Sequence, residues 1–322
     1  LAMTPLAPQM TRPTPVAALP GGPDVQATIA HLAGRPGPLR ALVEGGFEPG
    51  AAHRFHSLYW DSGRATLPSA YQQAVPGARA LFALHGLVSA HGACPFAEGC
   101  PSPDVFRAVA GLRTFGVGDL CVHTPRLVAE ADFEPALAAN GAFGPWRCYA
   151  VIPPPALVDL WDAPPPVVPA GDDWRQRFAA AVTAPGQPGP PRLVGEHLPP
   201  EVSGRLGEAD VWAHPPGCAP TVTVEPNRLV LDTPCPGHAH RLKYSFHGSF
   251  RADTGDVPFL VEPGFIGLIP SARRVVLTFG ATPGWRVAGW GSLWALLGLL
   301  LAGGARARRW IYGQRAVSRP PA

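Results

Sequence analysis

A stretch without a single charged residue runs from Val287 to Ala305, and leucine, alanine and glycine dominate its 19 positions. As a helix it would be about 28 Å long, close to the thickness of the hydrocarbon core of a bilayer. Aromatic residues flank it on both sides, as they do at membrane interfaces, and a cluster of arginines follows it. The pattern predicts a transmembrane helix over residues 285–306 and a cytoplasmic tail over residues 307–322, with everything before the helix extracytoplasmic. The alternative is a buried core helix of a soluble protein, although such a helix rarely lacks a polar face over this length.

Between residues 24 and 152 the apolar residues recur alternately with helical and with strand-like spacing. Four helices are expected: one that starts after Asp24, then Ala78–Ala90, Val105–Phe115 and Pro125–Ala139. Three strands are expected: Arg40–Val43, residues 119–124 and Phe143–Ile152. These elements predict an α+β extracytoplasmic domain over residues 24–152, preceded by a proline-rich linker over residues 1–23.

Proline-rich segments fill residues 153–210, where one short helix is expected over Asp173–Val182. From Val211 onward, short alternating apolar runs are separated by turn residues. They predict six strands: Thr221–Val224, Leu229–Asp232, Arg241–His247, Pro258–Glu262, Phe265–Ile269 and Arg274–Phe279. Strands of this length and spacing are typical of a small β-sandwich, which we place over residues 211–282. The expected fold class is α+β: a mixed α/β unit, a small β-sandwich and one C-terminal transmembrane helix.

Composition narrows the function classes. The chain has 322 residues and a formal net charge of +3, and Lys243 is the one lysine among its 26 basic residues. The arginines are scattered and form no basic stripe with interleaved aromatic residues, which argues against a nucleic acid as a partner. Leu1 is not an initiator residue, and the first 15 residues lack the apolar core of a signal peptide. We therefore expect the chain to be the C-terminal part of a longer polytopic protein whose earlier membrane helices precede it.

Six cysteines indicate an oxidising compartment. Cys218 and Cys235 flank a predicted hairpin whose turn centres on Pro226–Asn227. That register places the two cysteines opposite each other, which makes them the strongest candidate pair. Two further pairs are candidates: Cys94 with Cys100, which bracket a short loop, and Cys121 with Cys148, which lie on two predicted strands. Six small buried apolar residues are the alternative, and the absence of a Cys-x-x-Cys pair disfavours a zinc site.

Aromatic residues in predicted loops and at strand ends are the best candidates for ligand binding, because sugars stack their apolar faces on such rings. The set comprises Tyr59, Trp60, Tyr71, Trp146, Trp161 and Trp212. Tyr59, Trp60 and Asp61 form the best local combination, and we add Trp146 to them as the candidate sugar-binding residues. Ordinary core packing is the alternative for each ring.

Other polar groups are weaker candidates. His53 and His56 with Asp61 have a spacing that suits a metal or acid–base cluster, but no third ligand has clear spacing. His238 and His240 are expected on a solvated strand edge. Carboxylates lie near a predicted turn at Asp253, Asp256 and Glu262, where catalysis of glycoside hydrolysis competes with simple turn capping. The chain contains no nucleophile elbow, phosphate-binding loop, dinucleotide fingerprint or His-Glu-x-x-His motif.

Three segments carry a resemblance to a known family: Leu112–Thr124 with Phe143–Val151, Arg241–Gly255, and Phe259–Leu277. Together they resemble the C-terminal extracytoplasmic region of bacterial polytopic membrane proteins of the YfhO-like and pyruvoyl-tetrahydropterin synthase-related types, which resemble GT-C glycosyltransferases. The matching residues are Lys243, Tyr244, Ser245, His247, Pro263, Gly264, Phe265 and Pro270. Gly248 and Phe250 stand where the family has proline and tryptophan.

The resemblance implies a protein of the bacterial inner membrane that transfers sugars from lipid-linked donors. In such enzymes the catalytic acid lies in an early loop between N-terminal helices, so this chain is expected to lack catalytic residues and to need no cofactor or metal. Its expected partners are membrane lipid, a lipid-linked sugar or polysaccharide, and the preceding membrane helices of the same protein. The chain would be an accessory domain in the assembly of envelope polysaccharide or glycolipid.

Two other functions remain open. The chain could be a non-catalytic envelope-binding or assembly module with a single membrane anchor, or an extracytoplasmic hydrolase that uses its own histidines or carboxylates. The first predicts upstream helices without the early acidic residue, or no upstream helices, and the second predicts turnover by this chain alone.

Overall fold

The computed structural model describes residues 22–35, 37–45, 65, 67, 77–89, 101–168, 174–184, 192–195, 198–225 and 227–280. No helix in these ranges is long and apolar enough to cross a bilayer. The predicted transmembrane helix at 285–306 and the tail at 307–322 lie outside the described residues, as do several candidate residues: Tyr59, Trp60, Asp61, Cys94 and Cys100. The chain divides into two compact units after Thr278.

The first sheet has four strands in the order β1-β2-β4-β3. These strands are β1 (Arg40–Val43), β2 (Val117–Val122), β3 (Leu137–Phe143) and β4 (Trp146–Val151). β1 runs parallel to β2, and the other neighbours are antiparallel. The helices around the sheet are α1 (Gly22–Ala33), α4 (Ala78–Leu87), α5 (Val105–Thr114), α6 (Pro125–Phe133) and α7 (Trp174–Thr183).

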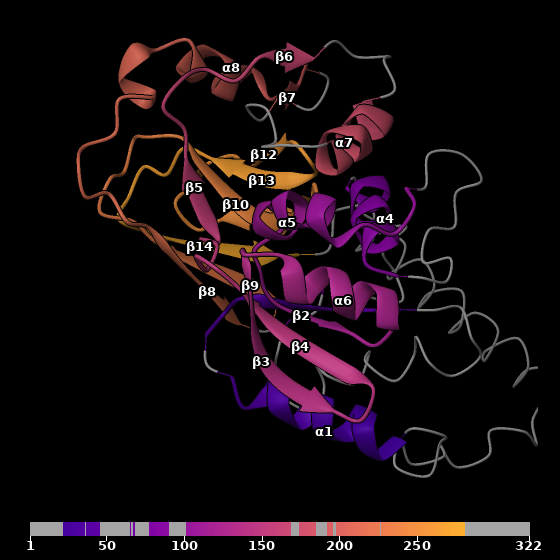
Figure 1. Ribbon diagram of the computed structural model, residues 1–322. Helices are drawn as coiled ribbons and strands as arrows, with labels where there is room; N and C mark the ends of the chain where they lie inside the picture. The colour runs from indigo at the N-terminus through magenta and orange to yellow at the C-terminus, as the bar shows by residue number, and fades with distance from the viewer. Residues whose placement is uncertain are drawn as a thin grey trace, which may run out of the picture. The chain divides into compact units, whose positions relative to one another are not determined.

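Alternation along the strands separates two cores, one on each face of this sheet. Leu120 and Val122 of β2 belong to the core that includes α4, α5, α6 and α7, whereas Cys121 between them belongs to the core under α1. Figure 1 shows α1 on one face and α5 and α6 on the other. The α+β class is therefore confirmed.

The helix expected over Pro125–Ala139 is wrong at its C-terminal end, because α6 stops at Phe133 and Leu137 already begins β3. Pro135 explains the stop, since proline has no backbone N–H and its ring clashes with the preceding turn of a helix. The strand expected over Phe143–Ile152 divides in the same way. Phe143 ends β3, and Gly144 turns the chain with a φ of 56°, in the region that favours glycine.

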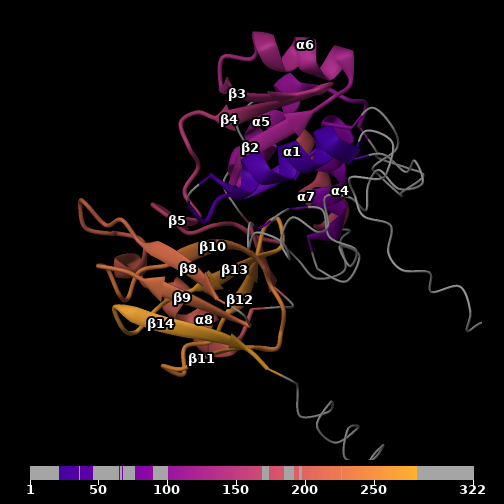
Figure 2. The same cartoon turned by 90° about the horizontal axis from the view of Figure 1, so that it is seen from below.

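The C-terminal half is a sandwich of two sheets, with strand orders β5-β10-β13-β12-β7-β6 and β11-β14-β9-β8. The first sheet comprises β5 (Val158–Leu160), β6 (Val167–Val168), β7 (Leu193–Val194), β10 (His240–Ser245), β12 (Phe259–Val261) and β13 (Phe265–Leu268). The second comprises β8 (Thr221–Glu225), β9 (Arg228–Asp232), β11 (Phe250–Ala252) and β14 (Arg274–Phe279). Figure 2 shows β8, β9, β10, β12, β13 and β14 grouped apart from β2, β3 and β4.

Apolar residues from both sheets form one shared core, as a sandwich requires. Leu231 and Leu277 contribute from one sheet, and Leu242 and Ile266 contribute from the other. All six strands expected after Val211 are present. The structure adds β11, and it adds β5, β6 and β7 from the segment expected to be a proline-rich connection, which also holds α8 (Pro200–Leu206) and the short helix η4 (Ala209–Val211).

Two disulfides are present among the described residues, and both are pairs that the sequence predicts. Cys218 is bonded to Cys235, with their Cα atoms 5.9 Å apart. The β8–β9 hairpin has the expected register, with Thr221 opposite Asp232, and Asn227 adopts a φ of 60° in the turn. Cys121 is bonded to Cys148, its direct cross-strand partner in β2 and β4, with the Cα atoms 4.1 Å apart.

Buried cations join the sandwich to the helical part of the same unit. The Nζ of Lys243 donates to the carbonyl of Arg113, at the end of α5, and lies 3.1 Å from a carboxylate oxygen of Asp159. The guanidinium of Arg40 donates to the carbonyl of Phe115 and lies 4.4 Å from the centre of the Tyr244 ring. Lys243 and Tyr244 belong to the residues that carry the family resemblance, and here they have a structural role.

Candidate functional site

A cleft of about 350 Å³ opens beside β11, between the β10–β11 and β11–β12 connections. This size lies at the lower end of the range for small-molecule sites. Two phenylalanines, a histidine, an arginine and an aspartate line it together with small residues. The lining residues are Phe246, His247, Gly248, Phe250, Arg251, Ala252, Gly255, Asp256, Val257 and Pro258.

The chain before β11 is held in place from the neighbouring sheet. The backbone N–H of Phe246 donates to the carbonyl of Gly264 at 2.8 Å. Gly264 has a φ of 121°, a conformation that side chains other than glycine rarely adopt, which gives a structural reason for glycine at this matching position. The backbone N–H of Ser249 donates to Nδ1 of His247 at 3.1 Å, so the neutral imidazole carries its proton on Nε2.

The charged residues of the cleft are oriented by the loops around them. The guanidinium of Arg251 donates to the carbonyls of Gly248 and Phe250, both at 2.7 Å. Oδ2 of Asp256 accepts from the hydroxyl of Thr254 at 2.6 Å and from the backbone N–H of Ser271 at 2.9 Å. These bonds all end on Oδ2, so that oxygen anchors the carboxylate to the neighbouring loop.

The arrangement combines aromatic surface with hydrogen-bonding groups of both kinds. Phe246 and Phe250 pack partly against the sandwich core, which fixes their rings and lowers the entropy cost of binding a ligand against them. The side chains of His247 and Arg251 supply donors, and the carboxylate of Asp256 supplies an acceptor. The set suits a small ligand that has an apolar face and hydrogen-bonding groups at its edge. No pair in the cleft has the geometry of a nucleophile with its base.

Trp146, expected to present its ring to a sugar, is instead only 8% exposed. Its indole packs on the imidazole of His123, with ring centres 4.4 Å apart, in the core under α1. Trp161 and Trp212, from the same expected aromatic set, are also buried and face each other at 5.7 Å. These large rings fill cores, where they bury the most apolar area.

The three carboxylates expected near one turn have separate partners. Asp253 accepts from the backbone N–H of Val276 in β14, and Asp256 binds Ser271. Glu262 is buried at 6% exposure, and its nearest cation is Arg192 at 3.8 Å. Burial therefore outweighs the attraction of Arg192 and raises the pKa of Glu262 to about 7.

This raised pKa predicts a pH-dependent stability. Folding favours the protonated form of Glu262, so the free energy of unfolding should fall as pH rises from about 4.5 through 7. Glu262→Gln keeps the side chain neutral at every pH. It should stabilise the chain by about 2 kcal/mol at pH 8 and have little effect at pH 4, as measured by chemical denaturation at both values. Equal effects at pH 4 and pH 8 would contradict this assignment.

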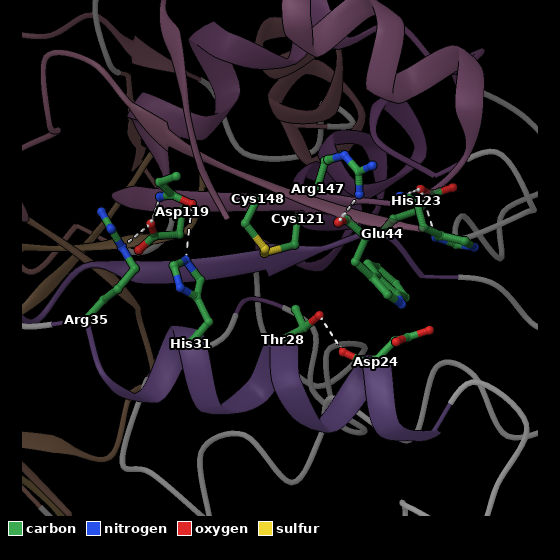
Figure 3. Close-up of a disulfide and its surroundings, with 12 residues drawn as sticks. Asp24, Thr28, His31, Arg35, Glu44, Asp119, Cys121, His123, Arg147 and Cys148 are labelled. Atoms are coloured by element: carbon green, nitrogen blue, oxygen red, sulfur yellow. Dashed lines mark hydrogen bonds and ion pairs between the residues drawn. A yellow bond between two sulfur atoms is a disulfide. The ribbon is translucent and has the colours of Figure 1, made fainter. Parts of the chain in front are cut away.

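A second buried carboxylate, Glu44, lies at the end of β1 near the Cys121–Cys148 disulfide (Figure 3). It accepts from the backbone N–H groups of His123 and Thr124 at 2.7 and 2.9 Å, and from the hydroxyl of Thr124 at 2.5 Å. Nδ1 of His123 lies 3.0 Å away. Burial alone would raise the pKa of Glu44, but these hydrogen bonds lower it to about 2. The group therefore fixes the end of β1 against the end of β2.

His240 does not lie on a solvated edge as expected, because it is fully buried in β10. Burial lowers its pKa to about 4, and the positive charges of protonated His238 and His214 would act in the same direction. His238 lies in the turn before β10, where it is partly buried, and the strand begins with the inward-facing His240.

Sequence reasoning did not select Phe246, Phe250 or Arg251 as binding residues. His247 had been noted only as a match to the family pattern. One signal was available, since the segment Arg241–Gly255 that carries the resemblance also builds most of the cleft. Comparison with protein-family models, curated proteins and solved structures gives no match for this chain. Function is therefore inferred from the side chains of the cleft.

Proposed function

We propose that this chain is the extracytoplasmic, saccharide-binding accessory domain of a glycosyltransferase-like protein of the bacterial inner membrane. The cleft beside β11 would bind the sugar of a lipid-linked donor or of the growing envelope polysaccharide. The two disulfides support an oxidising compartment outside the cytoplasm. β14, the neighbour of β11 in its sheet, ends at Phe279, a few residues before the segment predicted to span the membrane at 285–306.

The observation that carries the proposal is the pairing of Phe246 and Phe250 with Arg251 and Asp256 around one cleft. Apolar faces of a sugar ring can stack on the phenylalanines, while its hydroxyl groups donate to the carboxylate and accept from the guanidinium. Phe250 stands at the position where the resembling family has tryptophan, so an aromatic ring is retained there. The chain thus offers a binding site, and the chemistry of transfer would belong to other parts of the protein.

Replacement of Phe250 by alanine should weaken saccharide binding roughly tenfold, the loss expected for one aromatic contact of about 1.4 kcal/mol. Binding would be measured by calorimetry on the full chain in nanodiscs, against a panel of free hexoses, 6-deoxyhexoses and hexuronic acids. Phe133→Ala is the matched control, because Phe133 on α6 is 81% exposed and lies outside the cleft. Equal affinities of the Phe250→Ala and unaltered chains would contradict the proposal, as would failure of every sugar to bind.

The alternative function is a non-catalytic envelope-binding module with a single membrane anchor. The coding sequence upstream of Leu1 distinguishes this module from the transferase-associated domain. Several hydrophobic segments with an acidic residue in the first outer loop would support the transferase-associated function. Upstream segments without that acidic residue, or no such segments, would favour the binding module.

A further inference from the structure

A second cluster of chemically active side chains lies in the sandwich, away from the cleft. Sγ of Cys218, Sγ of Cys235 and a ring nitrogen of His240 all lie within 4.8 Å of one another. The three residues come from the loop before β8, the loop after β9 and the start of β10. The three residues do not form a Cys-x-x-Cys motif, because Cys218 and Cys235 are 17 positions apart in the sequence. The fold brings their side chains together.

The imidazole of His240 is held in one tautomer. Its Nδ1 donates to the carbonyl of His238 at 2.7 Å, so Nε2 carries the lone pair and accepts from the hydroxyl of Thr233 at 2.7 Å. That hydroxyl oxygen lies 3.3 Å from Sγ of Cys235. The Thr233 hydroxyl therefore contacts both Nε2 of His240 and Sγ of Cys235. Metal-binding histidines are commonly oriented in this way, by a hydrogen bond from the other ring nitrogen.

The two disulfides differ in their accessibility to an external reductant. Cys121 and Cys148 are completely buried in the first sheet, whereas Cys218 is partly exposed next to the buried Cys235. Thiol–disulfide exchange requires a thiolate to reach one of the sulfur atoms. A mild dithiol should therefore reduce the Cys218–Cys235 bond and leave the Cys121–Cys148 bond intact.

We propose that the reduced pair Cys218 and Cys235, together with His240, forms a binding site for a divalent cation of the Zn²⁺ class. Reduction by a dithiol breaks the S–S bond and yields two thiols, while the dithiol becomes a cyclic disulfide. Binding of the cation then releases the two thiol protons. The hydroxyl of Thr233 rotates away as Nε2 takes the metal.

Charge and ligand type favour this cation. Two thiolates neutralise a divalent ion, so the buried site carries no net charge, whereas a monovalent ion would leave a buried negative charge. Two sulfurs and one imidazole suit Zn²⁺, which takes a fourth ligand in a tetrahedral site. Water can supply that ligand.

The test uses the full chain in detergent with Cys94→Ser and Cys100→Ser in every variant, so that only the two described pairs remain. The protein is treated anaerobically with dithiothreitol, freed of reductant and titrated with Co²⁺ and then with Zn²⁺. One equivalent of Co²⁺ should bind and give a thiolate-to-metal charge-transfer band, which Zn²⁺ then displaces. Oxidised protein should show no band.

Variants separate a built site from incidental thiol binding. Cys218→Ser should abolish the charge-transfer band at one equivalent, and His240→Ala should weaken binding roughly tenfold or more. Thr233→Val removes the hydroxyl that occupies Nε2 and should retain or increase affinity. If His240→Ala does not fold, Cys218→Ser and Thr233→Val still test the proposal, because both variants keep the buried imidazole ring of His240 in the core. Absence of one-to-one binding after reduction, or the same affinity in Cys218→Ser, would overturn the proposal.

Discussion

Replacing both Cys121 and Cys148 with alanine is expected to lower the free energy of unfolding by about 3.5 kcal/mol. The bond closes a loop with a sequence separation of 27, and its loss gives the unfolded chain back the conformational entropy that the cross-link removed. The site is also completely buried between the sheet and α1, so the native fold cannot relax easily around the change. The denaturant midpoint of the full chain, compared with and without the replacement, measures the effect.

A control separates the cross-link from side-chain packing. The unaltered chain and the alanine variant are both unfolded again in strong reductant, which opens every disulfide, so that the two chains then differ only in the sulfur atoms of Cys121 and Cys148. If the cross-link dominates, their midpoints should be similar in reductant, and the unaltered chain should have the higher midpoint without it. A double variant within 1 kcal/mol of the oxidised chain would show that this disulfide does not stabilise the first sheet as its position implies.

Glu44→Gln is expected to cost about 3 kcal/mol at pH 7. The pKa of Glu44 is about 2 in the folded chain, against 4.5 ordinarily, so the folded state favours the ionised form. The stability that this preference contributes is fully present above pH 4.5 and is lost as pH falls toward 2. Glutamine has one side-chain oxygen in place of two, so the groups of His123 and Thr124 that donate to Glu44 lose one of the two acceptor atoms.

Urea denaturation between pH 7 and pH 3 measures this prediction. The unaltered chain should lose stability as the pH falls below 4.5, and the Glu44→Gln variant should lose less over the same interval. Glu225→Gln is the control, because Glu225 pairs with Arg228 at the surface and such pairs contribute under about 1 kcal/mol. Parallel pH curves for the Glu44→Gln and unaltered chains would contradict the role assigned to this carboxylate.

Sequence patterns predicted those helices, strands and turns that are determined by residues close together in the sequence. The hairpin of β8 and β9 could be anticipated down to its register, because turn residues and the spacing of Cys218 and Cys235 point to the same centre. The end of α6 was also readable in principle, since Pro135 forbids further helix, but apolar spacing through Leu137 masked it. The two- or three-residue strands β5, β6, β7 and β11 are too short to show alternation, and partners distant in sequence define them.

The candidate site could not be predicted, because it depends on contacts between residues that are far apart in the sequence. Glu44 finds its donors 79 and 80 residues away, and Phe246 is fixed by Gly264 in another strand. Exposure was the second gap, because Trp146 at the start of β4 was expected to present its ring to a ligand and is buried. A large aromatic ring at the end of a strand can complete a core, and the packing of α1 on the sheet decides that outcome here.

The central claim is that the cleft beside β11 binds a saccharide. Saturation-transfer NMR tests it most directly, on the full chain in nanodiscs with a panel of hexoses, 6-deoxyhexoses and hexuronic acids. Saturation of the aromatic protons should pass to the ring protons of at least one sugar class, and Phe250→Ala should remove most of that transfer while Phe133→Ala leaves it unchanged. Transfer to no sugar, or transfer that persists fully in Phe250→Ala, would contradict the account.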